Sequence, residues 1–360
     1  MRAWLIDDFK GIGGLRLAEV PDPVPQPDEV ILQLHYAALN PADRYLAENL
    51  YPAKPPLPHI LGRDGMGTVV AVGSGVRDVR VGDRRAILRG EVGGNRPGTF
   101  AERVAVPALD LVEIPAGWSE PEAAGATLVY LTAYQALTMW GPLGAAQDCH
   151  RERQWRVPGV TASSPLPSPP REEREIETAA AVLVTGASGG VGVAAVQLGA
   201  AMGHKVLGLS RNAEKRRRLE QLGAIATFNP EDPKWRQAVK TLLAPGRVDL
   251  AIDNIGGKLL PEVIEILGEH GRVSLVGRLA GPVPNFNTAT LFFRRLRLGG
   301  VAVGGWANAE SRAAWQHVVE LLARAGARPQ VDNVFLFDQL PQAFERLARG
   351  PMGKVLLAAA

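Results

Sequence analysis

The stretch Ala181–Gly192, which reads AVLVTGASGGVG, decides the fold of this chain. Its apolar beginning is typical of a strand buried in a parallel sheet. The glycines that follow open an alanine-rich helix, whose N–H groups favour a pyrophosphate that lies close to the backbone. A tight turn without a ligand is the alternative, although three separated glycines exceed what such a turn needs. The predicted cofactor contacts in this stretch are Ser188, Gly189, Gly190, Val191 and Gly192.

The end of the next strand, Lys205–Leu209, indicates which dinucleotide is bound. An acidic residue at that point would bind the ribose 2′-hydroxyl and select NAD. The sequence instead continues with Ser210 and Arg211, and Lys215 and Arg216 follow shortly after. A hydroxyl and cations hold a 2′-phosphate by charge-assisted hydrogen bonds, so Ser210, Arg211 and Lys215 predict NADP(H). The alternative is a solvated basic helix start without a ligand.

Strands and helices alternate through this part of the chain. Asp249–Asp253 and Gly271–Gly277 are further expected strands, with a helix at Leu259–Leu267 between them. This alternation predicts βαβ units in a doubly wound parallel sheet, whose strand ends face the ligand. The remaining residues assigned to the cofactor side are Gly208, Asn254, Gly256, Val276, Gly277 and Arg278. For the glycines, an ordinary loop-forming role is the alternative.

The first third of the chain has a different pattern, with short β runs broken by proline and glycine. Val30–Leu34 and Gly67–Gly73 are rich in β-branched residues and predict strands of a small antiparallel barrel or sandwich. Ser119 and Glu122 form the sequence signature of a capping box at a helix start. After Ser311 we expect a helix, a strand, another helix and a last strand at Lys354–Leu357. The fold class is therefore α/β, with a Rossmann-type sheet and a β-rich domain.

Residues 144–178 fit neither part, because they lack a hydrophobic period and hold five prolines between Pro158 and Pro170. Connections between a helix and a strand are usually about 2–6 residues long. We interpret the segment as a disordered insertion, derived from a mobile element or a misread reading frame. A regulatory or proline-recognition segment is the alternative.

Composition excludes several classes of protein. The 360 residues include 46% hydrophobic and 21% charged residues, which is ordinary for a globular protein. The net charge of +3 does not indicate a nucleic-acid partner, and Cys149 is the single cysteine, which excludes a disulfide framework. We expect no membrane partner and a cytoplasmic location, because no apolar run reaches the ~18 residues of a membrane span and the start lacks a signal-peptide core.

Four motifs in order resemble the medium-chain dehydrogenases/reductases, most closely the zinc-independent quinone oxidoreductase branch. They are Asn40–Asp43, Leu61–Gly67, Leu131–Tyr134 and Gly186–Gly192, and the likeness runs from Met1 to Leu357 outside the insertion. The resemblance implies a GroES-like catalytic domain over 1–125 and a Rossmann domain over 126–300. Residues 301–360 would complete the Rossmann sheet and return to the catalytic domain. The resemblance also implies a homodimer in which edge strands of the two copies pair, and Val301–Gly305 is a candidate for this edge strand.

The zinc-dependent branch would need a cysteine and a Gly-His-Glu motif where this chain has Asn40-Pro41 and Gly62-Arg63-Asp64. We therefore predict no metal site, and we interpret Arg63 and Asp64 as an ion pair that stabilises the domain.

The resemblance places Asn40, Tyr51 and Thr132 near the nicotinamide as catalytic candidates, with Thr132 also contacting the cofactor. The first two would donate hydrogen bonds to substrate or cofactor. Local roles are the alternatives: an Asx turn with Asp43 capping the next helix, and ring packing of Tyr51 on its loop. His59 is the one histidine expected close by. Phe292 and Phe293 are expected either to line the pocket or to belong to a core helix.

The predicted function is NADPH-dependent hydride transfer to quinones or α,β-unsaturated carbonyl compounds without a metal. A small electrophilic molecule is the expected substrate. Reduction of an enoyl thioester and a catalytically silent NADPH-binding protein remain the alternatives.

Overall fold

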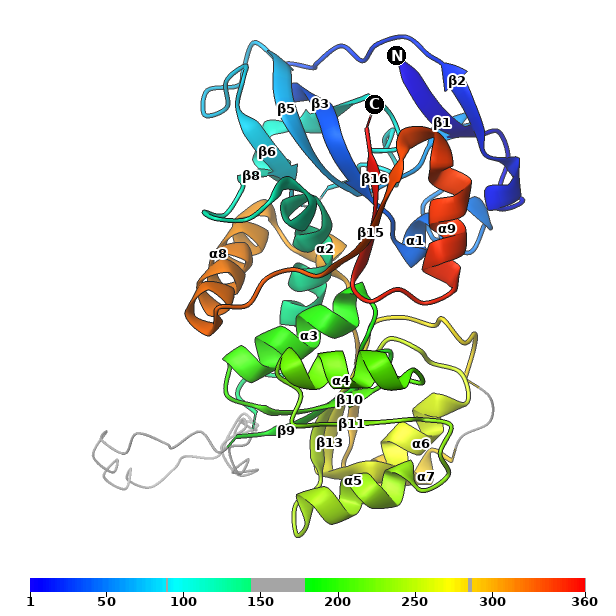
Figure 1. The fold of residues 1–360 in the computed structure, drawn as a ribbon, viewed down its shortest axis with the longest axis vertical. Helices are drawn as coiled ribbons and strands as arrows, with labels where there is room; N and C mark the ends of the chain where they lie inside the picture. Colours follow the sequence, from blue (N-terminus) through cyan, green and yellow to red (C-terminus); the bar gives the residue numbers. More distant parts are fainter. Residues whose placement is uncertain (89, 144–178, 284–286, 360) are drawn as a thin grey trace, which may run out of the picture.

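The computed structural model describes residues 1–88, 90–143, 179–283 and 287–359. Two sheet-containing regions lie one above the other in Figure 1, and the two chain termini are in the upper region. The interpretation of 144–178 as an insertion lies outside the described residues.

The lower region is a six-stranded sheet in which every pair of neighbouring strands is parallel. The strand order is β11-β10-β9-β12-β13-β14, which is the 3-2-1-4-5-6 order of a Rossmann fold. The prediction of a doubly wound sheet is confirmed. The strands are β9 (Ala181–Val184), β10 (Lys205–Leu209), β11 (Ala226–Phe228), β12 (Val248–Asp253), β13 (Leu267–Leu275) and β14 (Arg297–Gly300).

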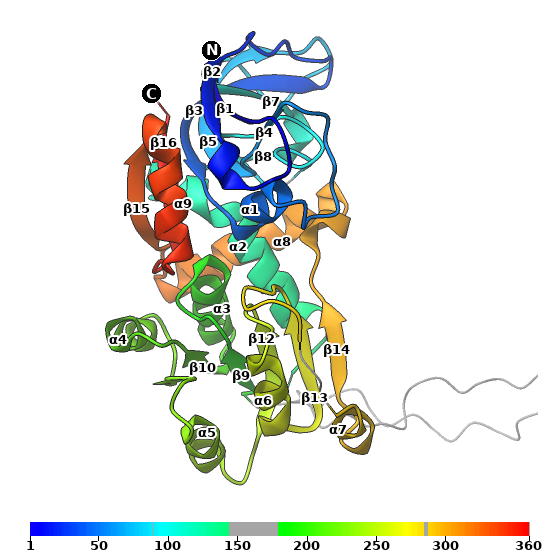
Figure 2. The same ribbon diagram turned by 90° about the vertical axis from the view of Figure 1, so that its right-hand side faces the viewer.

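Helices cover both faces of this sheet. Successive residues of a strand point to opposite sides, and both sides of these strands carry apolar residues that the helices bury. Val182 and Val184 belong to the hydrophobic cluster on one face, whereas Leu183 belongs to the cluster on the other. The helices of this region are α3 (Gly190–Ala201), α4 (Ala213–Gln221), α5 (Trp235–Leu243), α6 (Leu259–Ile266) and α7 (Ala289–Phe293) (Figure 2).

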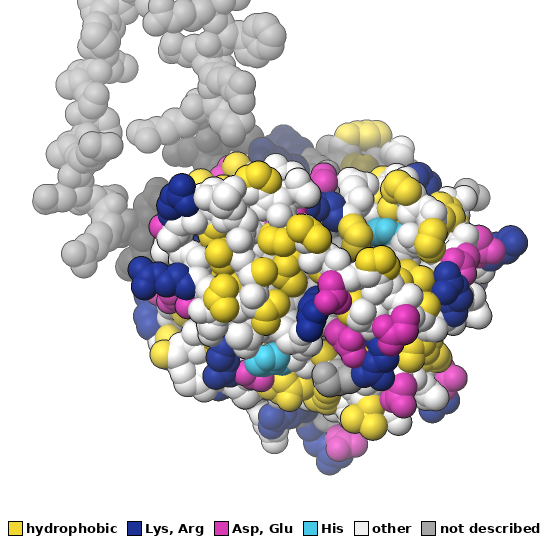
Figure 3. Space-filling view, turned by 90° about the horizontal axis from the view of Figure 1, so that it is seen from above, with side chains coloured by type: hydrophobic (Ala, Val, Ile, Leu, Met, Phe, Trp, Pro, Cys, Tyr) yellow, Lys and Arg dark blue, Asp and Glu magenta, His cyan; other side chains and the backbone are white. Residues whose placement is uncertain are grey.

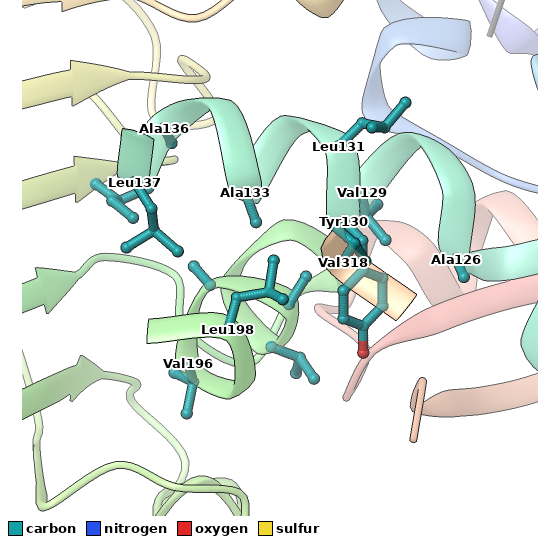
Figure 4. Packing of buried hydrophobic residues seen from close by; sticks show 14 of the residues in the cluster. Ala126, Val129, Tyr130, Leu131, Ala133, Ala136, Leu137, Val196, Leu198 and Val318 are labelled. Atoms are coloured by element: carbon teal, nitrogen blue, oxygen red, sulfur yellow. The ribbon is translucent and has the colours of Figure 1, made fainter. Parts of the chain in front are cut away.

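Helix α2 (Glu120–Thr138) connects the two regions, and its predicted capping box is present. The Ser119 hydroxyl accepts from the Glu122 N–H, and the Glu122 carboxylate accepts from the Ser119 N–H at 2.7 Å. The side chains of α2 pack on α3 and α8 (Asn308–Ala325), with Tyr130 buried beside Val318 (Figure 4). The Tyr130 hydroxyl donates to Gln197 of α3.

The upper region is built on a mainly antiparallel sheet, ordered β15-β16-β3-β5-β6-β8, with β7 also paired to β3. A second sheet has the order β2-β1-β4. The strands of both are β1 (Arg2–Ile6), β2 (Arg16–Glu19), β3 (Glu29–Ala38), β4 (His59–Ile60), β5 (Asp64–Val72), β6 (Arg84–Ile87), β7 (Arg103–Pro107), β8 (Leu111–Glu113), β15 (Val331–Leu336) and β16 (Lys354–Ala358). The helices are α1 (Pro41–Ala47), α9 (Leu340–Ala348) and the short 3₁₀ turns Ile12–Gly14, Ala108–Asp110 and Phe337–Gln339.

The end of the chain therefore completes a sheet that its beginning starts. Strand β16 pairs antiparallel with β3, with Leu356 opposite Ala38, and β15 pairs parallel with β16. This return places the start of β16 beside the lower region (Figure 1), where Gly353 bonds Ser188 and Lys354 packs against Gly190.

One prediction for the Rossmann edge is wrong, and one of two alternatives there is excluded. The edge strand is β14, and Val303–Gly305, which we expected within the edge strand, is a 3₁₀ turn. Phe292 and Phe293 do not belong to a core helix, since 65% and 76% of their surfaces are exposed on the short α7. Backbone pairing in a parallel sheet does not require an apolar run, which explains why β14 was missed.

Within the described residues, none of the helices combines the length and the apolar character needed to cross a membrane. On the face shown in Figure 3, basic and acidic side chains are interspersed rather than gathered by sign.

Candidate active site

The loop between β9 and α3 is formed by close backbone contacts. Gly186 has a φ of +56°, in the left-handed region that favours glycine. A Cβ on Gly192 would lie 2.6 Å from the Ala187 Cα, so only glycine fits there. These two glycines are explained by the protein itself.

Gly189 is different, because nothing inside the protein requires it to be glycine. Its φ is −74°, and a Cβ built on it would have only one neighbour within 4 Å, the Gly186 oxygen at 3.5 Å. Gly189 is also the N-cap of α3, and no side chain caps this helix. A small residue beside uncapped helix N–H groups fits a diphosphate against the backbone.

The loop is attached to the end of the chain. The Gly353 N–H donates to the Ser188 oxygen at 2.8 Å. A Cβ on Gly190 would lie 3.0 Å from the Lys354 Cδ and 3.1 Å from the Val129 Cγ1. Ser188 and Gly190 are thus fixed between α2 and β16.

The cations predicted to bind a 2′-phosphate gather where β10 ends. Arg216 donates to the carbonyls of Ser210 and Arg211 at 3.0 and 2.9 Å, and Lys215 donates to the Gly350 carbonyl. The Arg211 guanidinium is exposed and lies 3.8 Å from Glu231. Burial lowers the pKa of Lys215. Buried Ser210 and these side chains form a basic corner that fits the phosphate of NADP(H).

The ends of β12 and β13 pack against each other. The Asn254 side chain donates to the Thr185 carbonyl at 2.8 Å, and the Thr185 hydroxyl donates to Asp253 at 2.6 Å. Burial raises the pKa of Asp253. A Cβ on Gly277 would lie 2.8 Å from the Asn254 oxygen, so this glycine permits the two loops to meet.

The remaining residues of these loops with a predicted cofactor contact lie near Asp253 and the glycine loop. The Val276 N–H donates to the Asp253 carbonyl, and Gly256 has a φ of +66°. Gly208 packs against Ala187 of the glycine loop, with its built Cβ 3.3 Å away. Arg278 instead extends to the upper region.

Asn40 begins α1 and is 5% exposed. Its amide donates to the Asp64 carboxylate and the Ala38 carbonyl at 3.1 and 3.3 Å, and its Oδ1 accepts from Lys354 at 2.7 Å. Its backbone N–H donates to Asp43 at 2.8 Å, as the capping interpretation expects. Both amide hydrogens of Asn40 are therefore engaged within the protein.

Lys354 is a site residue that sequence reasoning missed. Its ammonium is buried and donates to the Leu39 carbonyl, Asn40 Oδ1 and Asp64 Oδ2 at 3.0, 2.7 and 2.8 Å. The available signal was a lysine that begins an otherwise apolar strand directly after Gly353.

The expected ion pair between Arg63 and Asp64 is wrong, because each residue has another partner. Asp64 pairs with Lys354, whereas the Arg63 Nε lies 3.6 Å from the Asp43 Oδ1. Neighbouring residues near a strand start point to opposite sides, which separates the two charges. The Arg63 guanidinium also stacks 4.3 Å over the Tyr51 ring and donates to the Tyr51 hydroxyl at 3.1 Å.

Two buried titratable groups lie beside Arg63. Burial raises the pKa of Asp43 to about 6, although the charge of Arg63 opposes this change. Burial also lowers the pKa of His59 to about 4, and the charge of Arg63 adds to that change. His59 is therefore neutral at pH 7, in the surroundings where the sequence placed it.

Thr132 lies on α2, and its hydroxyl donates to the Leu128 carbonyl one helical turn earlier at 2.7 Å. Any contact of Thr132 with a ligand would therefore use its oxygen as an acceptor. Among the described residues, no three His, Cys, Asp or Glu side chains converge as metal ligands would.

One edge of the Rossmann-type sheet lies against buried polar side chains of the β-rich domain. This is the arrangement of a two-domain, nucleotide-dependent oxidoreductase. Comparison with known proteins agrees with this class. A family model described as an alcohol dehydrogenase GroES-like domain matches residues 26–116, and one described as a zinc-binding dehydrogenase matches residues 190–324.

Relatives extend over nearly the whole chain. The quinone oxidoreductase of Lama guanicoe is 28% identical, with 99% of this chain and 97% of that protein covered. The human synaptic vesicle membrane protein VAT-1 homolog is 28% identical, with 99% and 86% covered. The solved Escherichia coli quinone oxidoreductase, complexed with NADPH, shares the fold with a TM-score of 0.82 at 22% identity, covering 99% of this chain and all of the other. The two family models and these relatives together support a medium-chain dehydrogenase/reductase of the quinone oxidoreductase branch.

Proposed function

We propose that this protein uses NADPH to reduce quinones or α,β-unsaturated carbonyl compounds by direct hydride transfer, without a metal. The observation that carries the proposal is Gly189, whose missing side chain leaves room beside uncapped helix N–H groups. The basic corner of Ser210, Arg211 and Lys215 supports NADPH over NADH. The names of the quinone oxidoreductase relatives support the acceptor class.

Bound NADPH supplies the hydride, and the protein supplies position and surroundings. The glycine loop holds the diphosphate, with Ser188, Gly189, Gly190, Val191 and Gly192 as contacts. The loops after β12 and β13 would hold a further part of the cofactor through Asn254, Gly256, Val276 and Gly277, and Gly208 supports the glycine loop by packing against Ala187. Buried Asn40 fixes the charged groups around Lys354, so we assign it a positioning role rather than a contact with substrate.

Tyr51 is the proposed catalytic residue of this set that reaches the substrate. Its hydroxyl oxygen accepts from Arg63 at 3.1 Å, so its own proton is directed elsewhere and is available to an acceptor oxygen. Thr132 offers its oxygen to the nicotinamide end of the cofactor. None of these groups is a strong acid or base at neutral pH, which suits hydride transfer followed by protonation from solvent.

No metal is required in this scheme. Where the zinc-dependent branch has its cysteine and its Gly-His-Glu motif, the chain has Asn40 and Gly62-Arg63-Asp64. A guanidinium is not a metal ligand, and the Asp64 carboxylate is paired with Lys354.

We further propose a homodimer, a cytoplasmic location and the domain division 1–125, 126–300 and 301–360. Strand β14 supports the dimer, because it is the last strand of the six-stranded sheet and its outer edge can pair with a second copy. The first domain boundary falls inside α2.

Titration of NADPH and NADH, followed by nicotinamide fluorescence, tests the cofactor assignment. We expect tight NADPH binding, weak NADH binding, and an approximately 10-fold loss of NADPH affinity in Arg211→Ala without a change for NADH. Arg217→Ala, on the same helix region but outside the proposed corner, is the matched control.

An acceptor panel of quinones, enones and enoyl thioesters then tests the reaction. NADPH binding without turnover of any acceptor would favour a silent binding protein. Turnover of enoyl thioesters alone would move the substrate class to that alternative.

A further inference from the structure

Unsatisfied polar atoms of the described residues concentrate in one place. Six buried side-chain nitrogen or oxygen atoms of the described residues have no hydrogen-bond partner, and four of the six belong to Asp43, His59 and Arg63. Two of these four, Asp43 Oδ1 and Arg63 Nε, face each other as an ion pair at 3.6 Å, which leaves His59 Nε2 and Arg63 Nη2. Asp43 and His59 are 0% and 4% exposed. Because buried polar groups are nearly always paired, this concentration indicates a place where a ligand completes the bonding.

Arg63 has two nitrogens, Nε and Nη2, without a hydrogen-bond partner among the described residues, and Nη2 also has no ion-pair partner there. Its Nη1 donates to the Tyr51 hydroxyl, its Nε lies 3.6 Å from the Asp43 carboxylate, and its Nη2 has no partner in the described part of the chain. The Tyr51 ring supports the guanidinium plane at 4.3 Å. The side chain is only 15% exposed, so its direction is fixed by these contacts rather than by solvent.

This group lies between two contacts with the Rossmann region. On one side, Arg278 of the loop after β13 donates to the Leu50 carbonyl at 3.4 Å, one residue before Tyr51. On the other side, Lys354 packs against Gly190 and bonds Asn40, whose N–H bonds Asp43. A cofactor bound along the glycine loop would therefore bring its reactive end toward Arg63.

We propose that Arg63 binds the carbonyl oxygen of the acceptor and stabilises the negative charge that this oxygen gains during reduction. The proposal rests on the proposed function and deepens it, because it adds a catalytic residue and limits the substrate to acceptors that become oxyanions. An enone gains a hydride at its β-carbon, and its C=C electron pair moves to give an enolate. Solvent then supplies one proton, so one NADPH and one proton are consumed and NADP⁺ is released.

The same balance holds for a quinone, which becomes a hydroquinone when it gains one hydride from NADPH and one proton from solvent, that is, two electrons and two protons. In both cases the Nη2 hydrogen bond strengthens as charge develops, which is the condition for lowering the barrier. Asp43 is a positioning residue, because it acts through the orientation of Arg63. Tyr51 provides the second donor to the same oxygen.

Two variants separate catalysis from folding. Arg63→Lys keeps a positive charge beside Asp43, and the double variant Arg63→Met/Asp43→Asn removes both charges so that neither remains buried alone. We expect kcat for 9,10-phenanthrenequinone to fall about 10-fold in the first and about 100- to 1,000-fold in the second. NADPH affinity should stay within about twofold of wild type in both. Arg77→Met, in an exposed turn, is the control and should keep wild-type kcat.

A second readout needs no turnover. The ionisation of 4-nitrophenol, followed by its absorbance with NADP⁺-loaded protein, reports a cation beside a phenolate oxygen. We expect wild type to lower the pKa of the bound nitrophenol by about one unit and the double variant to leave it unchanged. If wild type reduces no quinone or enone but lowers this pKa, the proposed function fails while the role of Arg63 as an oxyanion partner stands.

Three results would overturn the inference. They are wild-type kcat in the double variant, an equal loss of NADPH affinity and kcat in both variants, and a nitrophenol pKa that wild type does not lower.

Discussion

The glycine loop at the Rossmann edge and the charged cluster of the upper region are built by different means, and we propose that both face negative charge. The loop Gly186–Gly192 uses backbone N–H groups and the absence of side chains, all within one short segment. The charged cluster, defined as Asn40, Asp43, Arg63, Asp64 and Lys354, uses buried side chains from three distant segments.

The difference matters for how each region tolerates change. The glycine loop is disrupted when an added Cβ occupies space that its close backbone contacts need. Its sensitivity to substitution is therefore steric and local. A buried cluster of charges fails when one partner is removed, because the other remains desolvated without compensation. The two regions meet at Lys354, whose side chain touches Gly190 and bonds the cluster.

Lys354 is therefore where the largest effect is expected. Lys354→Met leaves the Asp64 carboxylate buried without its cation and should lower the free energy of unfolding by about 3–5 kcal/mol. Urea unfolding measures this loss. Lys354→Met/Asp64→Asn removes both charges and should recover much of it. An equal loss in the single and double variants would mean that the lysine stem, rather than its charge, stabilises the boundary.

The pH dependence of the unfolding free energy distinguishes Asp43 from His59, which both lie beside Arg63. The pKa of Asp43 is raised from 3.8 to about 6, so its burial costs stability progressively as pH rises through that range. The pKa of His59 is lowered from 6.5 to about 4, so its burial costs stability as pH falls through that range. Relative to wild type, Asp43→Asn should gain about 2–3 kcal/mol as pH rises from 4 to 6.

His59→Gln should show the opposite slope, with a similar relative gain as pH falls from 6.5 to 4. Unfolding series at several pH values measure both slopes. Slopes of the same sign would contradict the burial of one of the two groups.

Within the glycine loop, two neighbouring substitutions should separate packing from ligand binding. Gly192→Ala forces a Cβ against the Ala187 backbone and should cost about 1–3 kcal/mol of unfolding free energy. Gly189→Ala meets only an ordinary contact at 3.5 Å, so stability should change by less than about 0.5 kcal/mol. NADPH affinity should nevertheless fall in Gly189→Ala, as fluorescence titration would show. Unchanged affinity there would place the diphosphate elsewhere.

The same contrast explains what the sequence predicted. The sheet, the glycine loop and the capping box of Ser119 depend on neighbours in sequence, and their patterns were sufficient. The charged cluster depends on tertiary pairing, and adjacency in sequence led to the wrong partner for Arg63. Lys354 was invisible as a site residue because its partners lie 290 and 314 positions away.

The position of β16 has a consequence for the order of folding during synthesis. Lys354 is synthesised 314 residues after Asn40, to which it bonds in the folded protein. The Rossmann strands β9 to β14 are complete earlier and pair only with one another. Until β16 is made, the end of β3 that pairs with it, from Tyr36 to Ala38, is an open strand edge, and open edges favour association with other chains.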